Sequence, residues 1–432
     1  MKISKIFNST HIRVSAIGSL GIKFFSALFA FLNGILLARI LSVKDFGIYV
    51  LAFTTLTVLT VPVSLGLPNL ITRYISKYEV YEDKPAIKGL LIKTNIFVAI
   101  SCLLVYLIVF TSYFVWWKKY DAAFTETFIY ALIGLPFIAL GSLRSAALRG
   151  LKYVVLGQLP DTFLRNFLFF LGIAFFALLG YKLSPQSAIL LLTIATIISF
   201  FVGYYLLKVK LLKGLKHIKP VFKSKEWLKE SIPFTLTSGI EVIKSKSLTY
   251  ILAIFGSLEA VAIFEIASRS SALISFTLDG LNSAIAPYIS SAFEKKNMEN
   301  LQRIVTKTTR IVFVFALPVA LVFIIGGRPL LDFLYGKEYS IAYWPLVILC
   351  LGHLVNAFTG SAGIVLNMTG HQGYLSKSLA VMMVLMLLSS IPLVIKYDVI
   401  GASVAFSAIF IFQNILWVLY IRRNLRINTT IL

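Results

Sequence analysis

Long apolar runs, separated by short polar connections, are the feature that most constrains how this chain can fold. Each run holds about twenty or more residues, the length that an α-helix needs to cross the hydrocarbon core of a bilayer. Runs of this length fit helices rather than the shorter strands of a membrane barrel. Only 14% of the chain is charged, whereas a soluble chain has about 25%. We therefore predict an all-α integral membrane protein.

Twelve transmembrane helices can be placed on these runs. We predict them at residues 15–40, 46–68, 90–115, 123–143, 157–180, 186–207, 231–255, 261–289, 304–325, 342–368, 374–395 and 399–421. The longest connection is rich in lysine and divides the chain into three parts. These are an N-terminal six-helix lobe (1–207), a basic linker (208–230) and a C-terminal six-helix lobe (231–432).

Most of the 41 lysine and arginine residues fall in alternate connections, which lie on one side of the membrane in this topology. The positive-inside rule places both termini and the linker in the cytoplasm of a cell membrane. A net charge of +23 would indicate nucleic acid in a soluble protein, but topology explains it here, and we expect no nucleic-acid partner. The linker lysines either attract anionic membrane lipids or recruit an anionic cargo.

The two halves carry a weak repeat at a nearly constant separation. ILSVKDFGIY (40–49) aligns with FGSLEAVAIF (255–264), and LGLPN (65–69) aligns with DGLNS (279–283). With six helices in each half, both copies cross the membrane in the same direction. Parallel repeats of this kind usually hold substrate between them and rock about it.

Charged residues occur inside several predicted helices, although a charge at the bilayer centre costs at least about 2.5–3.5 kcal/mol. Helical spacing predicts ion pairs between Asp161 and Arg165, between Glu241 and Lys244, and between Glu265 and Arg269. The other charges in these helices are Lys23, Lys93, Lys246 and Asp279. Cations exceed acids, so we expect a positively charged interior. Ion pairs should concentrate in the C-terminal lobe and unpaired cations in the N-terminal lobe.

Two segments resemble a known family. ARILSVKDFGIYVLAFTTLTVLTVPVSLGLPNLITRYISK (38–77) resembles the opening hairpin of the polysaccharide transport family, the Wzx-type flippases of the MOP superfamily. YGKEYSIAYWPLVILCLGHLVNAFTGSAGIVLNMTGHQ (335–372) is similar to that family's ninth connection and tenth helix. The resemblance implies a V-shaped, MATE-like bundle of two six-helix lobes around a central cavity. It also implies transport of a polyprenyl-pyrophosphate-linked oligosaccharide to the outer leaflet by alternating access, coupled to H⁺ or Na⁺ or uncoupled, beside glycan-assembly enzymes.

A pyrophosphate cargo suits the cations inside the helices. We predict that substrate contacts Lys23, Lys93, Arg165, Arg269 and Lys244, because lysine attracts phosphate as a point charge and arginine binds it through two donors. The alternatives are that Lys23 and Lys93 reach the membrane interface, and that the arginines form structural ion pairs.

Four carboxylates are candidates for ion coupling, since a buried carboxylate favours its neutral form and can act as a protonation switch. They are Glu241, Asp279, Asp161 and Glu265. The alternatives are neutralisation of a neighbouring cation and, for Asp279, a position on the wall or at the cytoplasmic mouth of a water-filled cavity. Amides such as Asn33, Gln158, Asn282, Asn356 and Gln413 either bind sugar hydroxyls or bridge neighbouring helices.

Other functions have less support in the sequence. A MATE-like exporter of cationic drugs should have a neutral or acidic interior, and a glycan polymerase should have a long outer loop. We expect no catalytic residue and no cofactor, and G-x-x-x-x-G-K-[ST] does not occur. His353 and His371 are too few and too far apart for a metal site, and Cys102 and Cys350 fit apolar packing.

Overall fold

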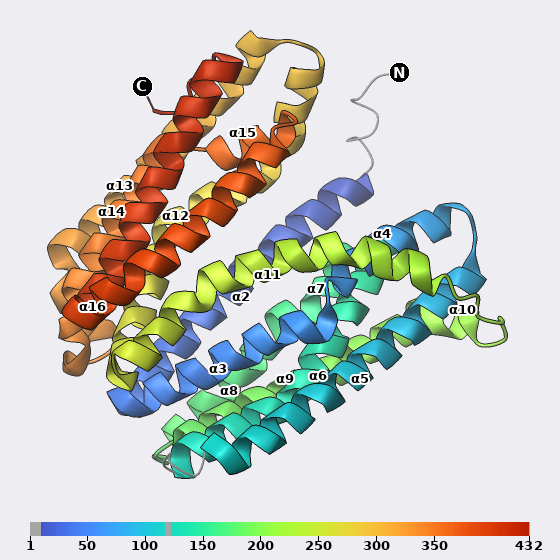
Figure 1. Ribbon diagram of the computed structural model, residues 1–432, viewed down its shortest axis with the longest axis horizontal. Coiled ribbons are helices and arrows are strands. Elements are labelled where there is room, and N and C mark those ends of the chain that lie inside the picture. Colours follow the sequence, from blue (N-terminus) through green and yellow to red (C-terminus); the bar gives the residue numbers. More distant parts are fainter. Residues whose placement is uncertain (1–9, 117–121, 432) are drawn as a thin grey trace. The chain divides into compact units, whose positions relative to one another are not determined.

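The computed structural model describes residues 10–116 and 122–431, and every regular element in these ranges is a helix (Figure 1). The chain forms two compact units, residues 1–246 and 247–432, so the division falls inside one long helix. Unit 1 contains α2 (Thr10–Ile40), α3 (Val43–Ser64), α4 (Leu67–Val80), α5 (Lys84–Trp116), α6 (Ala122–Gly150), α7 (Val154–Gln158), η2 (Leu159–Leu164), α8 (Arg165–Leu178), α9 (Pro185–Leu207), η3 (Lys208–Leu212), α10 (Lys213–Leu215) and most of α11 (Ser224–Phe255).

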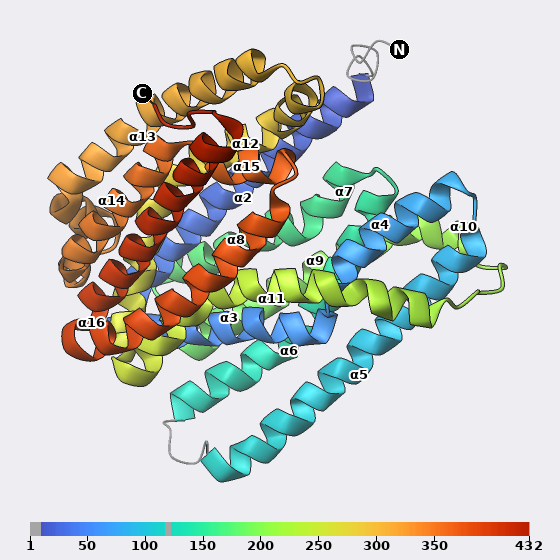
Figure 2. The ribbon, with the colours of Figure 1, turned by 45° about the horizontal axis from the view of Figure 1, so that its top comes forward.

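Unit 2 begins in the last turns of α11 and is also helical (Figure 2). It contains α12 (Leu258–Glu294), α13 (Met298–Leu334), η4 (Lys337–Ala342), α14 (Tyr343–Thr359), α15 (Ala362–Met368) and α16 (Gln372–Leu425). Helices α12, α13, α14 and α16 pack on one another. Trp417 of α16 is buried there and donates from Nε1 to the hydroxyl of Ser378, 2.8 Å away.

Ten helices within the described ranges are long and apolar enough to span a membrane. One of them, α16, has 54 residues and breaks at Asp398, whose φ of 48° is not helical. This break lies between the predicted helices 374–395 and 399–421. The charged helix α11 is not among the ten. The multi-pass membrane fold is therefore confirmed, whereas the total of twelve spans stays a prediction.

The internal repeat is visible in the way corresponding helices begin. Ser42 caps α3 by accepting a hydrogen bond from the backbone N–H of Asp45 at 3.1 Å. Ser257 caps α12 by accepting from the N–H of Ala260 at 3.0 Å. Both serines have an extended backbone, which a serine cap requires. They occupy equivalent positions in the sequence alignment of the two halves.

A second pair of turns repeats in the same register. After α4 the N–H of Asp83 bonds to the carbonyl of Tyr78, and after α12 the N–H of Asn297 bonds to the carbonyl of Ala292. Glu82 and Lys296, which precede these residues, are both left-handed, with φ of 53° and 55°. Each unit therefore holds a copy of the same helix–turn–helix segment.

The copies differ where α3 ends and α4 begins, since α12 continues through the equivalent position as one helix. Leu65 and Gly66 are both left-handed, with φ of 39° and 65°. A Cβ on Gly66 would lie 2.6 Å from the backbone nitrogen of Thr235 in α11. Glycine is needed here for its backbone conformation and for the close approach of α11.

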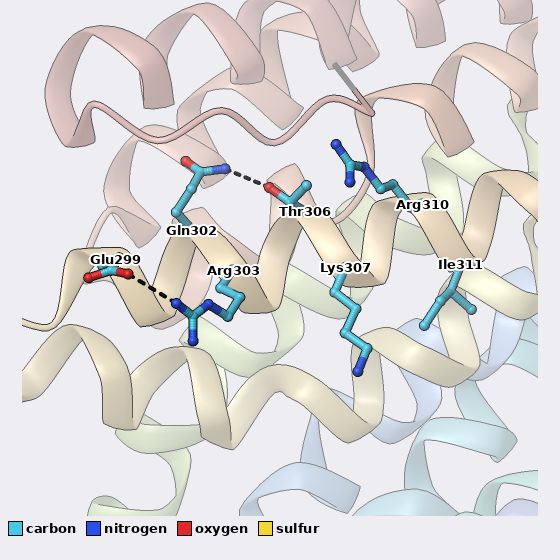
Figure 3. Close-up of a pocket in the computed structure, with 7 residues that line it drawn as sticks. All are labelled: Glu299, Gln302, Arg303, Thr306, Lys307, Arg310 and Ile311. Atoms are coloured by element: carbon cyan, nitrogen blue, oxygen red, sulfur yellow. Dashed lines mark hydrogen bonds and ion pairs between the residues drawn. The ribbon is translucent and has the colours of Figure 1, made fainter.

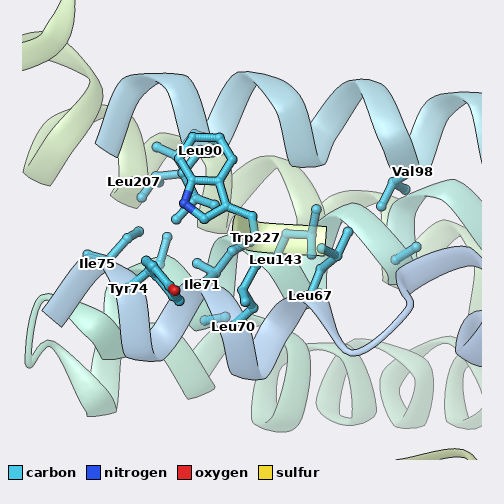
Figure 4. Packing of buried hydrophobic residues seen from close by; sticks show 14 of the residues in the cluster. Leu67, Leu70, Ile71, Tyr74, Ile75, Leu90, Val98, Leu143, Leu207 and Trp227 are labelled. Atoms are coloured by element: carbon cyan, nitrogen blue, oxygen red, sulfur yellow. The ribbon is translucent and has the colours of Figure 1, made fainter. Parts of the chain in front are cut away.

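The start of α11 is fixed in the core of unit 1 by Trp227. This side chain is 3% exposed and packs among apolar residues of α4, α5, α6 and α9 (Figure 4). Its indole N–H donates to the hydroxyl of Tyr78 at 3.0 Å. Two further contacts are made by residues just before it in the sequence. Lys223 Nζ forms an ion pair with Asp83 Oδ2 at 3.2 Å, and the hydroxyl of Tyr74 donates to Glu226 Oε1 at 2.8 Å. The basic linker therefore ends against α4.

Candidate functional site

The membrane helix formed by α7, η2 and α8 contains a π-helical turn at Leu159–Leu164. Pro160 has no backbone N–H, and the N–H of Arg165 bonds to the carbonyl of Pro160, five residues earlier. The predicted helix 157–180 is therefore irregular at its start. π-helical turns are rare and occur frequently at functional sites.

Asp161, inside this turn, pairs with Arg144 of α6. Arg144 Nη2 lies 2.6 Å from Asp161 Oδ1, and the side chain of Arg144 is only 4% exposed. The other terminal nitrogen of Arg144 donates to the carbonyl of Phe200, and the guanidinium lies 5.1 Å from the centre of the Phe200 ring. Arg144 therefore contacts η2 through Asp161 and α9 through Phe200.

Two glycines make room for this pair. A Cβ on Gly203 of α9 would overlap the guanidinium of Arg144. A Cβ on Gly141 of α6 would lie 3.1 Å from Asp161 Oδ1. A larger residue at either position would displace one partner, so the local sequence is adapted to bury the ion pair.

Arg149 and Arg165 each interact electrostatically with the carboxylate of Asp161. Together with the pair of Arg144 and Asp161 they form what we call the arginine cluster, which consists of Arg144, Arg149, Asp161 and Arg165. The Nε atoms of Arg149 and Arg165 and the Oδ2 atom of Asp161 are buried, and none has a hydrogen-bond partner among the described residues. The cluster has three guanidinium groups and one carboxylate. It therefore carries excess positive charge and unused hydrogen-bond donors inside a membrane-spanning unit.

The predicted contact ion pair between Asp161 and Arg165 is wrong, because Asp161 makes its contact with Arg144. Arg165 retains only an electrostatic interaction with Asp161. The prediction used the spacing of a regular helix, and this part of the chain is π-helical. It also ended the preceding helix at residue 143, whereas α6 continues to Gly150 and carries Arg144 inside the unit. The uncharged sequence SAAL (145–148) between Arg144 and Arg149 could have shown that the helix continues.

A polar face of α2 lies against the π-helical turn. The hydroxyl of Ser26 donates to the carbonyl of Thr162 at 2.8 Å, and Asn33 Nδ2 donates to the carbonyl of Asn166 at 3.0 Å. Ser19 donates to Gln158 Oε1 at 2.7 Å. Asn33 and Gln158 therefore bridge helices, the second of the two roles considered for them, and α2 supplies donors to carbonyls around the irregular turn.

The two predicted unpaired lysines of unit 1 occupy different surroundings. Lys23 is exposed and lies one turn from both Ser19 and Ser26, beside the polar face of α2. Lys93 is exposed on α5 together with the apolar side chains of Ile96 and Ile100. Lys23 therefore lies beside the α2 residues that contact the π-helical turn, whereas Lys93 lies among exposed apolar side chains.

Further along unit 1, Glu241 and Lys244 lie one turn apart on α11. Glu241 is exposed and Lys244 is half-buried. Their roles in substrate binding and ion coupling stay predictions.

Unit 2 confirms the predicted pair of Arg269 and Glu265 on α12. Arg269 Nε lies 2.5 Å from Glu265 Oε1, and both side chains are largely buried. The expectation that ion pairs concentrate in the C-terminal half is nevertheless wrong, because the pair of Arg144 and Asp161 is buried in unit 1. The sequence did not reveal this pair because its members are on different helices.

A second polar group in unit 2 surrounds His353 of α14. His353 Nδ1 lies 2.7 Å from the hydroxyl of Ser275 on α12, and Asn356 Nδ2 lies 3.5 Å from the same hydroxyl. Asp279, one turn after Ser275, is exposed. This contact between α12 and α14 was not predictable from the sequence, where His353 stood out only as a potential metal ligand.

Comparisons with known proteins agree with this fold. The sequence profile described as "Polysaccharide biosynthesis protein" matches residues 15–293, more than half of the chain, and the MatE profile matches residues 233–397. A curated relative, the probable low-salt glycan biosynthesis flippase Agl15 of Haloferax volcanii, is 21% identical over 47% of this chain. The match spans 43% of that relative, less than half of its length.

Solved structures of MOP transporters share the fold. A multidrug resistance MATE family transporter in an inward-facing conformation has a TM-score of 0.78 at 17% identity, over 95% of this chain and 98% of its own. The lipid II flippase MurJ in an inward closed conformation has a TM-score of 0.73 at 14% identity, over 93% and 86%. A MOP superfamily transporter from Pyrococcus furiosus, described with a binding pocket of reversed polarity, has a TM-score of 0.65 at 16% identity. The match covers 96% of this chain and 95% of that transporter.

The resemblance noted in the sequence is therefore confirmed by the profile match, by the relative and by the fold. This chain belongs to the polysaccharide biosynthesis protein family of membrane transporters.

Proposed function

We propose that this protein is a flippase that moves a polyprenyl-pyrophosphate-linked oligosaccharide from the cytoplasmic to the outer leaflet by alternating access. The observation that carries the proposal is the arginine cluster, where the buried Nε donors of Arg149 and Arg165 have no acceptor within residues 10–116 and 122–431. A buried donor without a partner costs about 1–3 kcal/mol. A pyrophosphate would supply the acceptors and offset the excess positive charge.

Arg165 is the proposed phosphate ligand of the cluster, while the paired Arg144 is a positioning residue. Lys23, on the neighbouring face of α2, would attract the anionic head group as a point charge. Lys244 and Arg269 stay proposed substrate contacts, Arg269 by exchanging Glu265 for substrate. Lys93, among exposed apolar side chains of α5, is better explained as an interfacial anchor.

Coupling to H⁺ or Na⁺ is a separate part of the proposal. Asp161 and Glu265 already neutralise arginines, so protonation of either would release a guanidinium for substrate. Glu241 and Asp279 remain the exposed candidates. Partnership with glycan-assembly enzymes, a cell-membrane location and cytoplasmic termini follow from the proposed cargo and from the distribution of basic residues.

Export of a cationic drug is the second candidate, supported by the MatE profile match and the MATE-like fold. A cationic drug would need carboxylates or other hydrogen-bond acceptors in its binding site. The arginine cluster offers three cations against one carboxylate, which favours an anionic cargo. Enzymatic activity is not part of either proposal.

The test is reconstitution of the purified protein in vesicles that contain a fluorescent polyprenyl-pyrophosphate glycan, with its appearance in the opposite leaflet as the readout. We expect protein-dependent flipping that falls at least about tenfold in Lys23→Ala and in Arg165→Gln, since each loses a charged contact of about 1.5–3 kcal/mol. Lys93→Ala is the matched control and should retain most activity. Efflux of a cationic dye without any flipping of the glycan lipid would reject the proposal.

A further inference from the structure

Helix α13 presents one exposed face that is cationic at one end and apolar along its middle. Arg303, Lys307 and Arg310 are exposed at helical spacing near the start of the helix. The same face continues with the exposed side chains Ile311, Val314, Phe315, Val322 and Ile325. The change from charged to apolar occurs between consecutive residues, Arg310 and Ile311.

The length of the apolar part matches a bilayer. Arg328 is the next exposed cation on this face, and it packs 5.1 Å from the centre of the Tyr343 ring. Arg328 follows Arg310 by eighteen positions, which corresponds to about 27 Å along a helix. The hydrocarbon core is about 30 Å thick, so the cationic end of α13 lies at the level of the lipid head groups.

An open groove lies at this cationic end. It has a volume of about 570 Å³ and is lined by Glu299, Gln302, Arg303, Thr306, Lys307, Arg310 and Ile311. Figure 3 shows Arg303 and Lys307 on one side of the helix axis, and Gln302, Thr306 and Arg310 on the other. The groove carries three cations and one acid. Glu299 pairs with Arg303 at 3.0 Å and leaves the charges of Lys307 and Arg310 without an acidic partner among the described residues.

The extended segment after α16 is hydrogen-bonded to the same part of α13. Gln302 and Asn428 form a reciprocal pair: Gln302 Nε2 donates to the carbonyl of Asn428 at 2.7 Å, and the N–H of Asn428 donates to Gln302 Oε1 at 2.8 Å. Thr309 donates to the carbonyl of Thr429 at 2.9 Å. Arg310 Nε lies 3.5 Å from the carbonyl of Ile431. This contact orients the side chain of Arg310 toward the segment after α16 and leaves its terminal nitrogens available to a ligand in the groove.

We propose that this groove binds the phosphate head group of an anionic phospholipid, whose acyl chains lie along the apolar face of α13. Lys307 and Arg310 contact the phosphate, and Ile311, Val314 and Phe315 contact the chains. Charge complementarity selects an anionic lipid over a zwitterionic one, and the adjoining apolar face selects a lipid over free phosphate. All of these residues belong to unit 2, so this site is separate from the arginine cluster of unit 1.

The proposal can be tested by native mass spectrometry of the full-length protein in detergent, titrated with phosphatidylglycerol or phosphatidylcholine. We expect Lys307→Gln/Arg310→Gln to lower the association constant of the first phosphatidylglycerol about 25-fold, or about fivefold per cation. The matched control is Arg422→Gln/Arg423→Gln, which removes two exposed cations from the last turn of α16. The control should change the constant less than about twofold.

Three results would overturn the proposal. Equal losses in the two double variants would mean that the lipid is attracted by general surface charge. Equal binding of phosphatidylcholine and phosphatidylglycerol by the wild type would remove the role of the cations. Binding of glycerol phosphate as tight as that of phosphatidylglycerol would mean that the apolar face has no part. Because the readout is bound lipid, none of these outcomes depends on glycan transport.

Discussion

The pairing of Asp161 with Arg144 leads to a sharp prediction for stability. Asp161→Asn removes the counterion from a guanidinium that is 4% exposed. Removal of one partner of a buried pair costs about 3–5 kcal/mol. Because 28% of the Asp161 side chain is exposed, water screens part of the interaction, and we expect the lower end, about 3 kcal/mol. The measurement is equilibrium unfolding of the purified protein in mixed micelles with increasing SDS.

Double-mutant cycles identify the partner of Asp161. We expect Asp161→Asn and Arg144→Met to couple by about 2 kcal/mol or more. Asp161→Asn and Arg165→Gln should couple more weakly, because Arg165 interacts with Asp161 electrostatically but makes no ion-pair contact with it. Replacement of both partners, as in Arg144→Met/Asp161→Leu, should restore stability to within about 1 kcal/mol of the wild type. A stronger coupling of Asp161 to Arg165 than to Arg144 would refute the reasoning and favour the pair expected from helical spacing.

A control separates burial from the mere presence of an ion pair. Glu299 and Arg303 lie at a similar distance, 3.0 Å, but their side chains are 85% and 74% exposed. We expect Glu299→Gln to change the free energy of unfolding by less than about 0.5 kcal/mol. A loss as large as that of Asp161→Asn would contradict the role given to burial.

Two further predictions concern unit 1. Gly203→Ala places a methyl group against the Arg144 guanidinium, and we expect a loss of about 1–3 kcal/mol in the same unfolding assay; an unchanged stability would contradict the close packing. The hydrogen bond to Asp83 raises the pKa of Lys223, so its stabilising effect is complete below the unfolded pKa of about 10.4 and is lost as pH rises through the higher folded value. Unfolding midpoints measured from pH 8 to 12 should fall above about pH 10.4 more steeply in the wild type than in Lys223→Met, and equal slopes would exclude this contribution.

Several parts of the fold follow from the sequence alone. Apolar runs of membrane-spanning length predict helices, because a helix pairs every backbone N–H and C=O group within the segment that lies in lipid. The repeat was visible because Ser42 and Ser257, as helix caps, serve a local need that a short sequence match can reveal. The pair of Glu265 and Arg269 was predictable for the same reason, since both residues lie on one turn of a regular helix.

The arginine cluster needed the tertiary structure. Local spacing assigned Asp161 to Arg165, but a π-helical turn and the approach of α6 bring Arg144 to Asp161 instead. The packing of α9 makes this pairing possible, because Gly203 has no side chain and leaves space for the guanidinium of Arg144 beside Asp161. Sequence therefore determined the membrane class, the repeat and the excess of cations, because these depend on composition and local periodicity. Which cation is neutralised and which stays available for a ligand depends on contacts between helices far apart in the chain, and only the folded unit decides that.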